Sequence, residues 1–185
     1  MKKWLENYYL LYQKALSNEN FFNELEIFKA KCIEIKLNGK KLLLAGNGAS
    51  ASIASHAATD FTKQAKIRAQ CFTDANLITA FANDYGYENW VNKAIEFYHD
   101  EGDVIVLISS SGKSKNLINA AKYAKSKGLY VITFTGFDEN NELRQNGDLN
   151  FWLNSKAYNI IECTHMIWIT TVVDMIIGKA EYSVV

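Results

Sequence analysis

A histidine and an aspartate stand four residues apart in the stretch from Lys41 to Phe61, KLLLAGNGASASIASHAATDF. The second half of this stretch has the pattern of a helix rich in small residues. Residues at positions i and i+4 of a helix share one face, so His56 and Asp60 can act together as titratable groups. The alternative is a structural histidine that is hydrogen-bonded in place, and this stretch alone favours neither interpretation.

The same stretch contains a glycine turn that suits an anion. Gly46 and Gly48 follow a short apolar run, 41–45, that is typical of a buried strand. Neither glycine has a Cβ, so the backbone can turn sharply and approach a ligand closely. The helix that begins near Ala49 directs its free N–H groups and its positive dipole end toward the turn, which favours a phosphate. The alternative is a tight strand-to-helix connection without a ligand.

A serine-rich loop, Ser109 to Ser114, is the second candidate for binding an anion. It follows an apolar run and precedes a helical pattern, so its hydroxyl groups and helix-start N–H groups can form a neutral cradle for a phosphate. Serine-rich turns often only cap helices. Because two anion-suited turns occur together, we favour binding. We expect a phosphorylated small molecule whose other end meets His56 and Asp60.

Two nucleotide-binding motifs are matched only in part. The glycine turn at 46–51 fits the relaxed G-x-G-x-x-G/A pattern, but neither Asp60 nor Asp74 stands where the acidic ribose ligand is expected. The tripeptide 112–114 resembles the end of a P-loop, but Leu107 occupies the position of the required first glycine. We therefore expect no nucleotide cofactor.

Five apolar runs alternate with helical patterns along the chain. The predicted strands are 41–45, 68–72, 103–109, 129–134 and 149–153. This alternation predicts an α/β fold with a doubly wound, flavodoxin-like parallel five-stranded sheet. In such a sheet both candidate loops lie at the carboxyl ends of strands, where open α/β sheets bind their ligands.

We predict a single domain, 1–185, with an α/β core at 41–178. Residues 1–38 predict an N-terminal helical pair that is interrupted at residues 17–20, and residues 158–177 predict a long C-terminal helix. We expect the aromatic helical pair to pack against a partner subunit. The alternative is a helical lid on the chain's own sheet.

The charge balance, the cysteines and the lengths of the apolar runs disfavour several classes of protein. Twenty basic and twenty acidic residues cancel, and the isoelectric point is about 6.8, which argues against a nucleic-acid-binding domain that works by bulk charge. Cys32, Cys71 and Cys163 are widely spaced, as expected of free thiols in a reducing compartment. We expect no membrane span, because no unbroken apolar run approaches the length of one, and no secretory signal, because the amino terminus lacks its features. We expect a cytoplasmic protein with no nucleic-acid or membrane partner.

Three segments together resemble the SIS (sugar isomerase) domain of the phosphoheptose isomerase group. They are GNGASASIASHAATDF, TDANLITAFANDYGYEN and EGDVIVLISSSGKSKNLINAAKYAKSKGLYVITFTG. The resemblance covers residues 41–136 and continues more loosely through the last helix. It implies the SIS fold, a homotetramer with active sites between subunits, and conversion of sedoheptulose 7-phosphate to a manno-heptose 7-phosphate.

The resemblance also implies roles for individual residues. The implied sugar contacts are Asn47, Gly48, Ala49, Ser50, Asn83, Asp84 and Glu162, and the implied phosphate contacts are Ser109, Ser110, Ser111 and Ser114. Asp60 is implied as the general base, and His56 as an acid or a metal ligand. A zinc ion, if bound as in some members, would be held by His56, Asp60 and Glu162.

Three departures from the family pattern bear on function. Asp60 stands where the family has a glutamate, Glu162 where it has a glutamine, and Thr170 where it has its second catalytic histidine. Sugar isomerisation needs a base and an acid, and threonine cannot titrate near neutral pH.

The leading hypothesis is an isomerase of ketose and aldose phosphates. The alternative is a non-catalytic SIS protein that binds a sugar phosphate or a protein partner as a tetrameric scaffold. For Glu162 and His165, the alternative to a site role is two polar residues on an interfacial face of the last helix.

Overall fold

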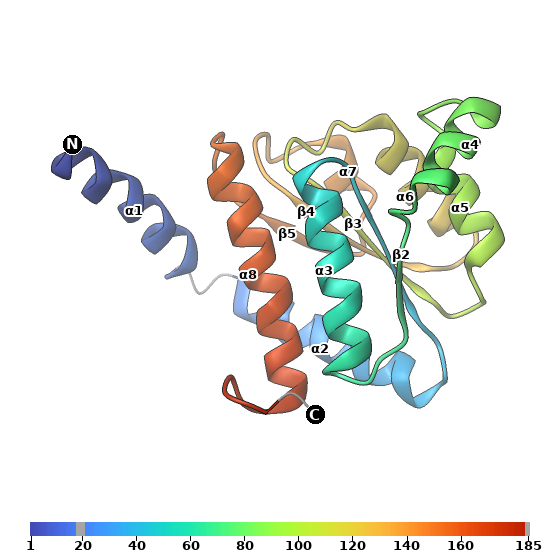
Figure 1. Cartoon of the computed structure of the whole chain (residues 1–185), viewed down its shortest axis with the longest axis horizontal. Coiled ribbons are helices and arrows are strands. Elements are labelled where there is room, and N and C mark those ends of the chain that lie inside the picture. Colours follow the sequence, from blue (N-terminus) through green and yellow to red (C-terminus); the bar gives the residue numbers. More distant parts are fainter. Residues whose placement is uncertain (18–20, 184–185) are drawn as a thin grey trace.

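The computed structural model describes residues 1–17 and 21–183. At its centre is a five-stranded parallel sheet with the strand order β2-β1-β3-β4-β5 (Figure 1). The strands are β1 (Leu42–Gly46), β2 (Ala69–Cys71), β3 (Val104–Ser109), β4 (Tyr130–Thr135) and β5 (Leu149–Trp152). The predicted fold class and five-stranded parallel sheet are confirmed, and β2 is shorter than the predicted run.

Helices cover both faces of the sheet, which explains the continuous apolar character of the central strands. Every residue of β1 and of β3 is buried. Alternate side chains enter different cores: Leu42 and Leu44 join one cluster, and Leu43 and Ala45 join the other. Two hydrophobic cores therefore hold the sheet in place from opposite sides.

Each core is closed by its own helices. One face carries α2 (Phe22–Leu37), α3 (Ala49–Lys63) and α8 (Tyr158–Ile177), and Figure 1 shows α3 and α8 side by side. The other face carries α4 (Ala75–Tyr85), α5 (Trp90–Tyr98), α6 (Lys115–Ser126) and the one-turn helix α7 (Glu142–Gln145). Because α3 and α8 each follow a strand, both begin at the carboxyl edge of the sheet.

The first helix, α1 (Lys2–Leu16), projects from the body of the molecule (Figure 1). Only Ala15 is buried, whereas Trp4 and Tyr9 are 61% and 65% exposed. The hydroxyl of Tyr12 donates a 3.4 Å hydrogen bond to the carbonyl of Asn159 on α8. The lid interpretation is therefore right for α2, which packs on the sheet, and wrong for α1. The predicted interruption at 17–20 lies mostly outside the described residues.

The last helix corrects one expectation from sequence. α8 is 20 residues long with a mean hydropathy of 1.6, so by length and composition alone it could cross a membrane. Its polar residues hide this apolar character when the sequence is scanned for unbroken runs. Trp168, Ile169 and Val172 are buried in the core beside α3, so the fold uses α8 as a core helix.

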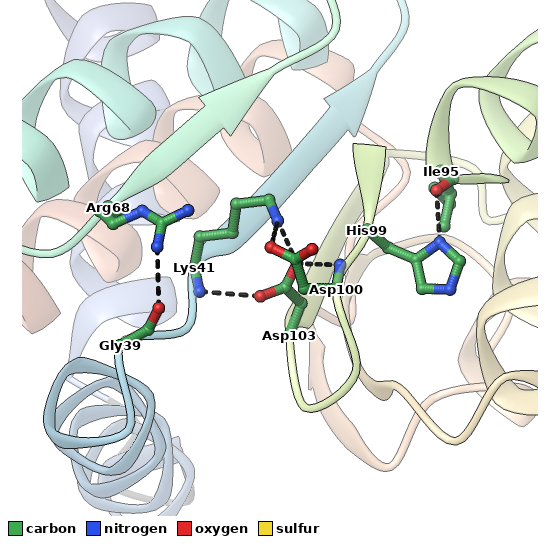
Figure 2. Close-up of polar contacts among 7 residues, drawn as sticks. All are labelled: Gly39, Lys41, Arg68, Ile95, His99, Asp100 and Asp103. Carbon is green, nitrogen blue, oxygen red and sulfur yellow. Dashed lines mark hydrogen bonds and ion pairs between the residues drawn. The ribbon is translucent and has the colours of Figure 1, made fainter. Parts of the chain in front are cut away.

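A buried ion pair closes the amino edge of the sheet, opposite the candidate loops (Figure 2). Lys41 Nζ lies 2.6 Å from Asp103 Oδ2 and 2.6 Å from Asp100 Oδ2. The other oxygen of Asp103 accepts a 2.9 Å hydrogen bond from the Lys41 backbone N–H, and Asp103 is only 1% exposed. These contacts tie the start of β1 to the loop that precedes β3.

Candidate functional site

The glycine turn has the predicted form of a strand that passes directly into a helix. A Cβ on Gly46 would lie 2.5 Å from backbone atoms of Ser50, so only glycine fits there. Gly48 has a φ of +56°, a conformation that glycine adopts without strain. The N–H groups of the first turn of α3 therefore face the carboxyl edge of the sheet, where an anion or a sugar oxygen can meet them.

The serine loop forms a compact group of hydroxyls at the end of β3. Ser109 and Ser110 are buried, and Ser109 Oγ lies 3.1 Å from Ser114 Oγ. Ser111 Oγ accepts a 3.3 Å hydrogen bond from the backbone N–H of Lys113. Ser114 occupies the N-cap position of α6 but makes no side-chain capping bond. Its hydroxyl bonds to Ser109 rather than to the helix backbone, and its remaining hydrogen-bonding capacity can serve a ligand at the helix start.

Glu162 belongs to the neighbourhood of the serine loop. Ser110 Oγ donates a 3.4 Å hydrogen bond to Glu162 Oε1, which links the first turns of α8 to the end of β3. A carboxylate beside a phosphate cradle repels the phosphate, so a sugar hydroxyl is the more suitable ligand for Glu162.

His56 and Asp60 form the predicted pair on one face of α3. His56 Nε2 lies 3.1 Å from Asp60 Oδ2, and their side chains are 55% and 23% exposed. At 1.5 Å per residue, they lie roughly 10 and 16 Å along the helix from its first residue, Ala49. Within one chain the pair therefore lies far along α3 from the carboxyl edge of the sheet, which carries both loops. That one ligand meets both the loops and this pair stays a prediction.

An open hollow borders His56 on the outer face of α3. Its volume is about 520 Å³, and its lining residues are Ala51, Ser52, Ser55, His56, Thr59 and Thr73. The side chains along this face are small, so they leave room for a ligand or for another protein surface.

The proposed zinc donors do not converge within one chain. Glu162 bonds to Ser110, whereas Asp60 pairs with His56. Among residues 1–17 and 21–183, no group of three or more His, Cys, Asp or Glu side chains is placed to hold a metal ion. The donor set does not fit zinc in this arrangement, so zinc binding stays a prediction and no chemical step is derived from it.

The two polar residues in the middle of α8 have structural contacts. His165 is fully buried, its Nε2 lies 3.1 Å from the Thr135 carbonyl, and burial lowers its pKa to about 4. The alternative that places it on an interfacial face is therefore wrong. Thr170 Oγ1 donates to the Met166 carbonyl of its own helix at 3.0 Å. Neither side chain supplies a group that titrates near neutral pH.

Asn83 and Asp84 lie in the last turn of α4, where Asn83 Nδ2 donates a 2.9 Å hydrogen bond to Asp84 Oδ1. The segment that follows α4 reaches the glycine turn, because Tyr87 Oη donates to Asn47 Oδ1 at 3.1 Å. Tyr87 therefore connects the segment after α4 to the glycine turn, whereas Asn83 and Asp84 bond to each other.

Two residues of this neighbourhood are absent from the sequence-based prediction. Asn116 exchanges two hydrogen bonds with Asn47, at 3.0 and 2.9 Å, and Tyr87 adds the third contact. The only sequence signal was proximity: Asn116 follows the serine loop by two residues, and Tyr87 follows the N-D-Y-G turn. Their pairing with a residue of a distant loop depends on the fold.

Comparison with known proteins gives a consistent result. A family model described as the SIS domain matches residues 13–136. Phosphoheptose isomerase of Sulfurimonas denitrificans is 32% identical over 173 residues, covering 90% of this chain and 88% of the relative. The phosphoheptose isomerase of Campylobacter concisus is also 32% identical, covering 93% and 94%. The solved phosphoheptose isomerase of Neisseria gonorrhoeae superimposes with a TM-score of 0.85 at 27% identity, covering 96% of this chain and 98% of that one.

Proposed function

We propose that this chain, which belongs to the SIS domain family and is related to the phosphoheptose isomerases, interconverts a ketose phosphate and an aldose phosphate. The substrate that we propose is sedoheptulose 7-phosphate, and the product is a manno-heptose 7-phosphate. The observation that carries the proposal is the joint presence, on one rim of the sheet, of a serine cradle and a glycine turn that are hydrogen-bonded to each other through Asn47 and Asn116.

Each of the two loops binds a different part of the ligand. The phosphate is held by the hydroxyls and helix-start N–H groups of Ser109, Ser110, Ser111 and Ser114. The sugar chain extends toward the glycine turn, where the contacts are Asn47, Gly48, Ala49, Ser50, Asn83, Asp84 and Glu162. The neutral cradle binds the dianionic phosphate through hydrogen bonds and the dipole of α6.

Asp60 and His56 supply the proton transfers. Asp60 removes a proton from the carbon beside the carbonyl group, and His56 donates a proton to the carbonyl oxygen, which gives an enediol. Return of a proton to the former carbonyl carbon, with loss of the hydroxyl proton on the carbon that was first deprotonated, gives the aldose without net gain or loss of atoms. The 3.1 Å contact between the two side chains supports this pairing, because the carboxylate orients the imidazole.

We further propose that a second copy of the chain brings its His56–Asp60 pair to the rim. The distance of the pair from the loops along α3 supports a site shared between copies, as does the hollow lined by small side chains. The exposed aromatic face of α1 supports association of copies. We expect a cytoplasmic homotetramer, and light scattering on the eluted peak of a sizing column would measure its mass.

Turnover of sedoheptulose 7-phosphate by the purified chain tests the isomerase. We expect conversion by the wild type, and conversion at a strongly reduced rate by Asp60→Asn with ligand binding retained. A panel of other ketose phosphates would identify a different substrate. Tight binding of sugar phosphates without conversion of any of them would overturn the isomerase.

That result would favour the second candidate, a non-catalytic SIS protein that binds a sugar phosphate or serves as a tetrameric scaffold. The observation in its favour is Thr170, whose hydroxyl bonds to carbonyls of its own helix and cannot act as an acid at neutral pH.

A further inference from the structure

We propose that Asn116 is a positioning residue that orients the amide of Asn47 for the sugar, an inference that rests on the proposed function. Asn47 Nδ2 donates to Asn116 Oδ1 at 3.0 Å, and Asn116 Nδ2 donates to Asn47 Oδ1 at 2.9 Å. Asn116 is 3% exposed in the first turn of α6, so it is fixed by its surroundings. Asn47 lies on a turn and takes its orientation from this partner.

The hydrogen bonds decide what Asn47 can offer a ligand. An amide oxygen has two acceptor positions and an amide nitrogen has two N–H donors. Both positions on Asn47 Oδ1 are used, by Asn116 Nδ2 and by Tyr87 Oη at 3.1 Å. One N–H of Asn47 is used on Asn116, and the other has no hydrogen-bond partner among residues 1–17 and 21–183. Asn47 therefore presents a single donor, which suits a carbonyl or hydroxyl oxygen of the sugar.

Asn116 also connects the sugar turn to the phosphate cradle. It stands two residues after Ser114, whose hydroxyl lies 3.1 Å from that of Ser109. The first turn of α6 thus carries both a phosphate contact and the partner of Asn47. This arrangement fixes the spacing between the phosphate subsite and the first sugar contact, which makes Asn116 a determinant of sugar length as well as of orientation.

Calorimetric titration of an Asn116→Leu variant with two ligands tests this role. We expect binding of sedoheptulose 7-phosphate to weaken at least about tenfold, since a polar partner is lost. Binding of inorganic phosphate, which needs only the serine cradle, should change less than about twofold. The matched control is Asn119→Leu on the same helix, whose amide donates to the Glu88 carbonyl at 2.9 Å. In this control, both affinities should stay within about twofold of the wild type.

A double-mutant cycle separates positioning from a general structural effect. In an Asn47→Ala background, Asn116→Leu should cause little further loss of sugar-phosphate affinity, because Asn116 acts through Asn47. Additive losses, or equal losses for inorganic phosphate, would overturn the role. If Asn116→Leu does not fold, Tyr87→Phe removes one contact to Asn47 at an exposed position. It should weaken only sugar-phosphate binding, and an unchanged affinity would count against the inference.

Titration of the wild type distinguishes failure of the proposed function from failure of the positioning role of Asn116. If the wild type bound phosphate but no sugar phosphate, the proposed function would fail, and the role of Asn116 would fail with it. If the wild type bound sedoheptulose 7-phosphate and the Asn116 and Tyr87 variants bound it equally well, only the positioning role would fail.

Discussion

Nε2 of His56 lies 3.1 Å from Oδ2 of Asp60, and the helical rise places the pair roughly 10 to 16 Å along α3 from its start at the carboxyl edge of the sheet. This relationship keeps the two titratable side chains together and separates them from the residues that would bind the phosphate. The proposed chemistry therefore makes separate predictions for the pair, for the cradle and for the assembly.

Asp60→Asn should lower kcat for sedoheptulose 7-phosphate by about 10²- to 10⁴-fold, because a neutral amide cannot act as the base. Asp60→Glu should also lose activity, by about a hundredfold, because it moves the carboxylate by one methylene. Steady-state kinetics and calorimetric affinities measure both effects. A kcat near that of the wild type for Asp60→Asn would exclude Asp60 as the base.

Mixed assemblies should recover activity from two impaired chains. Asp60→Asn removes the base and Ser110→Ala weakens the phosphate cradle. An assembly that contains both variants would hold some intact sites if each site takes the pair from one copy and the cradle from another. We expect mixing, dissociation and reassembly to give activity well above that of either variant alone. Mixed assemblies without recovered activity would place the complete site within one chain.

Ser114→Ala should raise KM for the sugar phosphate about tenfold, the scale of one hydrogen bond to a charged group. Helix stability should change little, because Ser114 makes no side-chain capping bond in α6. Substrate-dependent rates give KM, and thermal unfolding monitors the fold. An unchanged KM would remove Ser114 from the phosphate site.

Asp103→Ala should destabilise the fold by about 3–5 kcal/mol, because it leaves Lys41 buried without its main partner. Lys41 is 8% exposed and Asp103 is 1% exposed, so water cannot easily replace the lost contact. Urea unfolding measures the change, and Glu101→Ala, at an exposed position of the neighbouring turn, is the control. A loss as small as that of the control would show that the ion pair contributes little.

The buried imidazole of His165 should make stability depend on pH. Burial lowers its pKa from 6.5 to about 4, so the unfolded chain binds a proton more readily than the folded chain between these values. The stabilisation is complete above pH 6.5 and declines as the pH falls toward 4, by about 3 kcal/mol in total. His165→Gln should flatten this part of the stability curve in urea unfolding at several pH values. An unchanged slope would assign the pH dependence to other groups.

Much of the fold was predictable because the patterns are local. The central strands read as continuous apolar runs, since helices bury both of their faces. Gly46 was identifiable as a turn residue because it follows an apolar run and has no Cβ, and in the structure a Cβ there would meet the backbone of Ser50. The extent of the apolar helix α8 was also predicted from the sequence. Its polar residues interrupt the apolar run, so its sufficient length and hydropathy for a membrane span were missed.

By itself, the sequence determined the order of strands and helices along the chain, the two loops at the carboxyl edge and the shared face of His56 and Asp60. Only the tertiary structure decided which polar side chains meet. Asn47 and Asn116 are 69 residues apart, and Ser110 and Glu162 are 52 apart, yet each pair is hydrogen-bonded. Helical and strand periodicity fixes the face on which a residue lies. The partner that it meets depends on the spatial order of the strands in the sheet and on the rise along each helix. The rise along α3 also separates Asp60 from the carboxyl edge of the sheet.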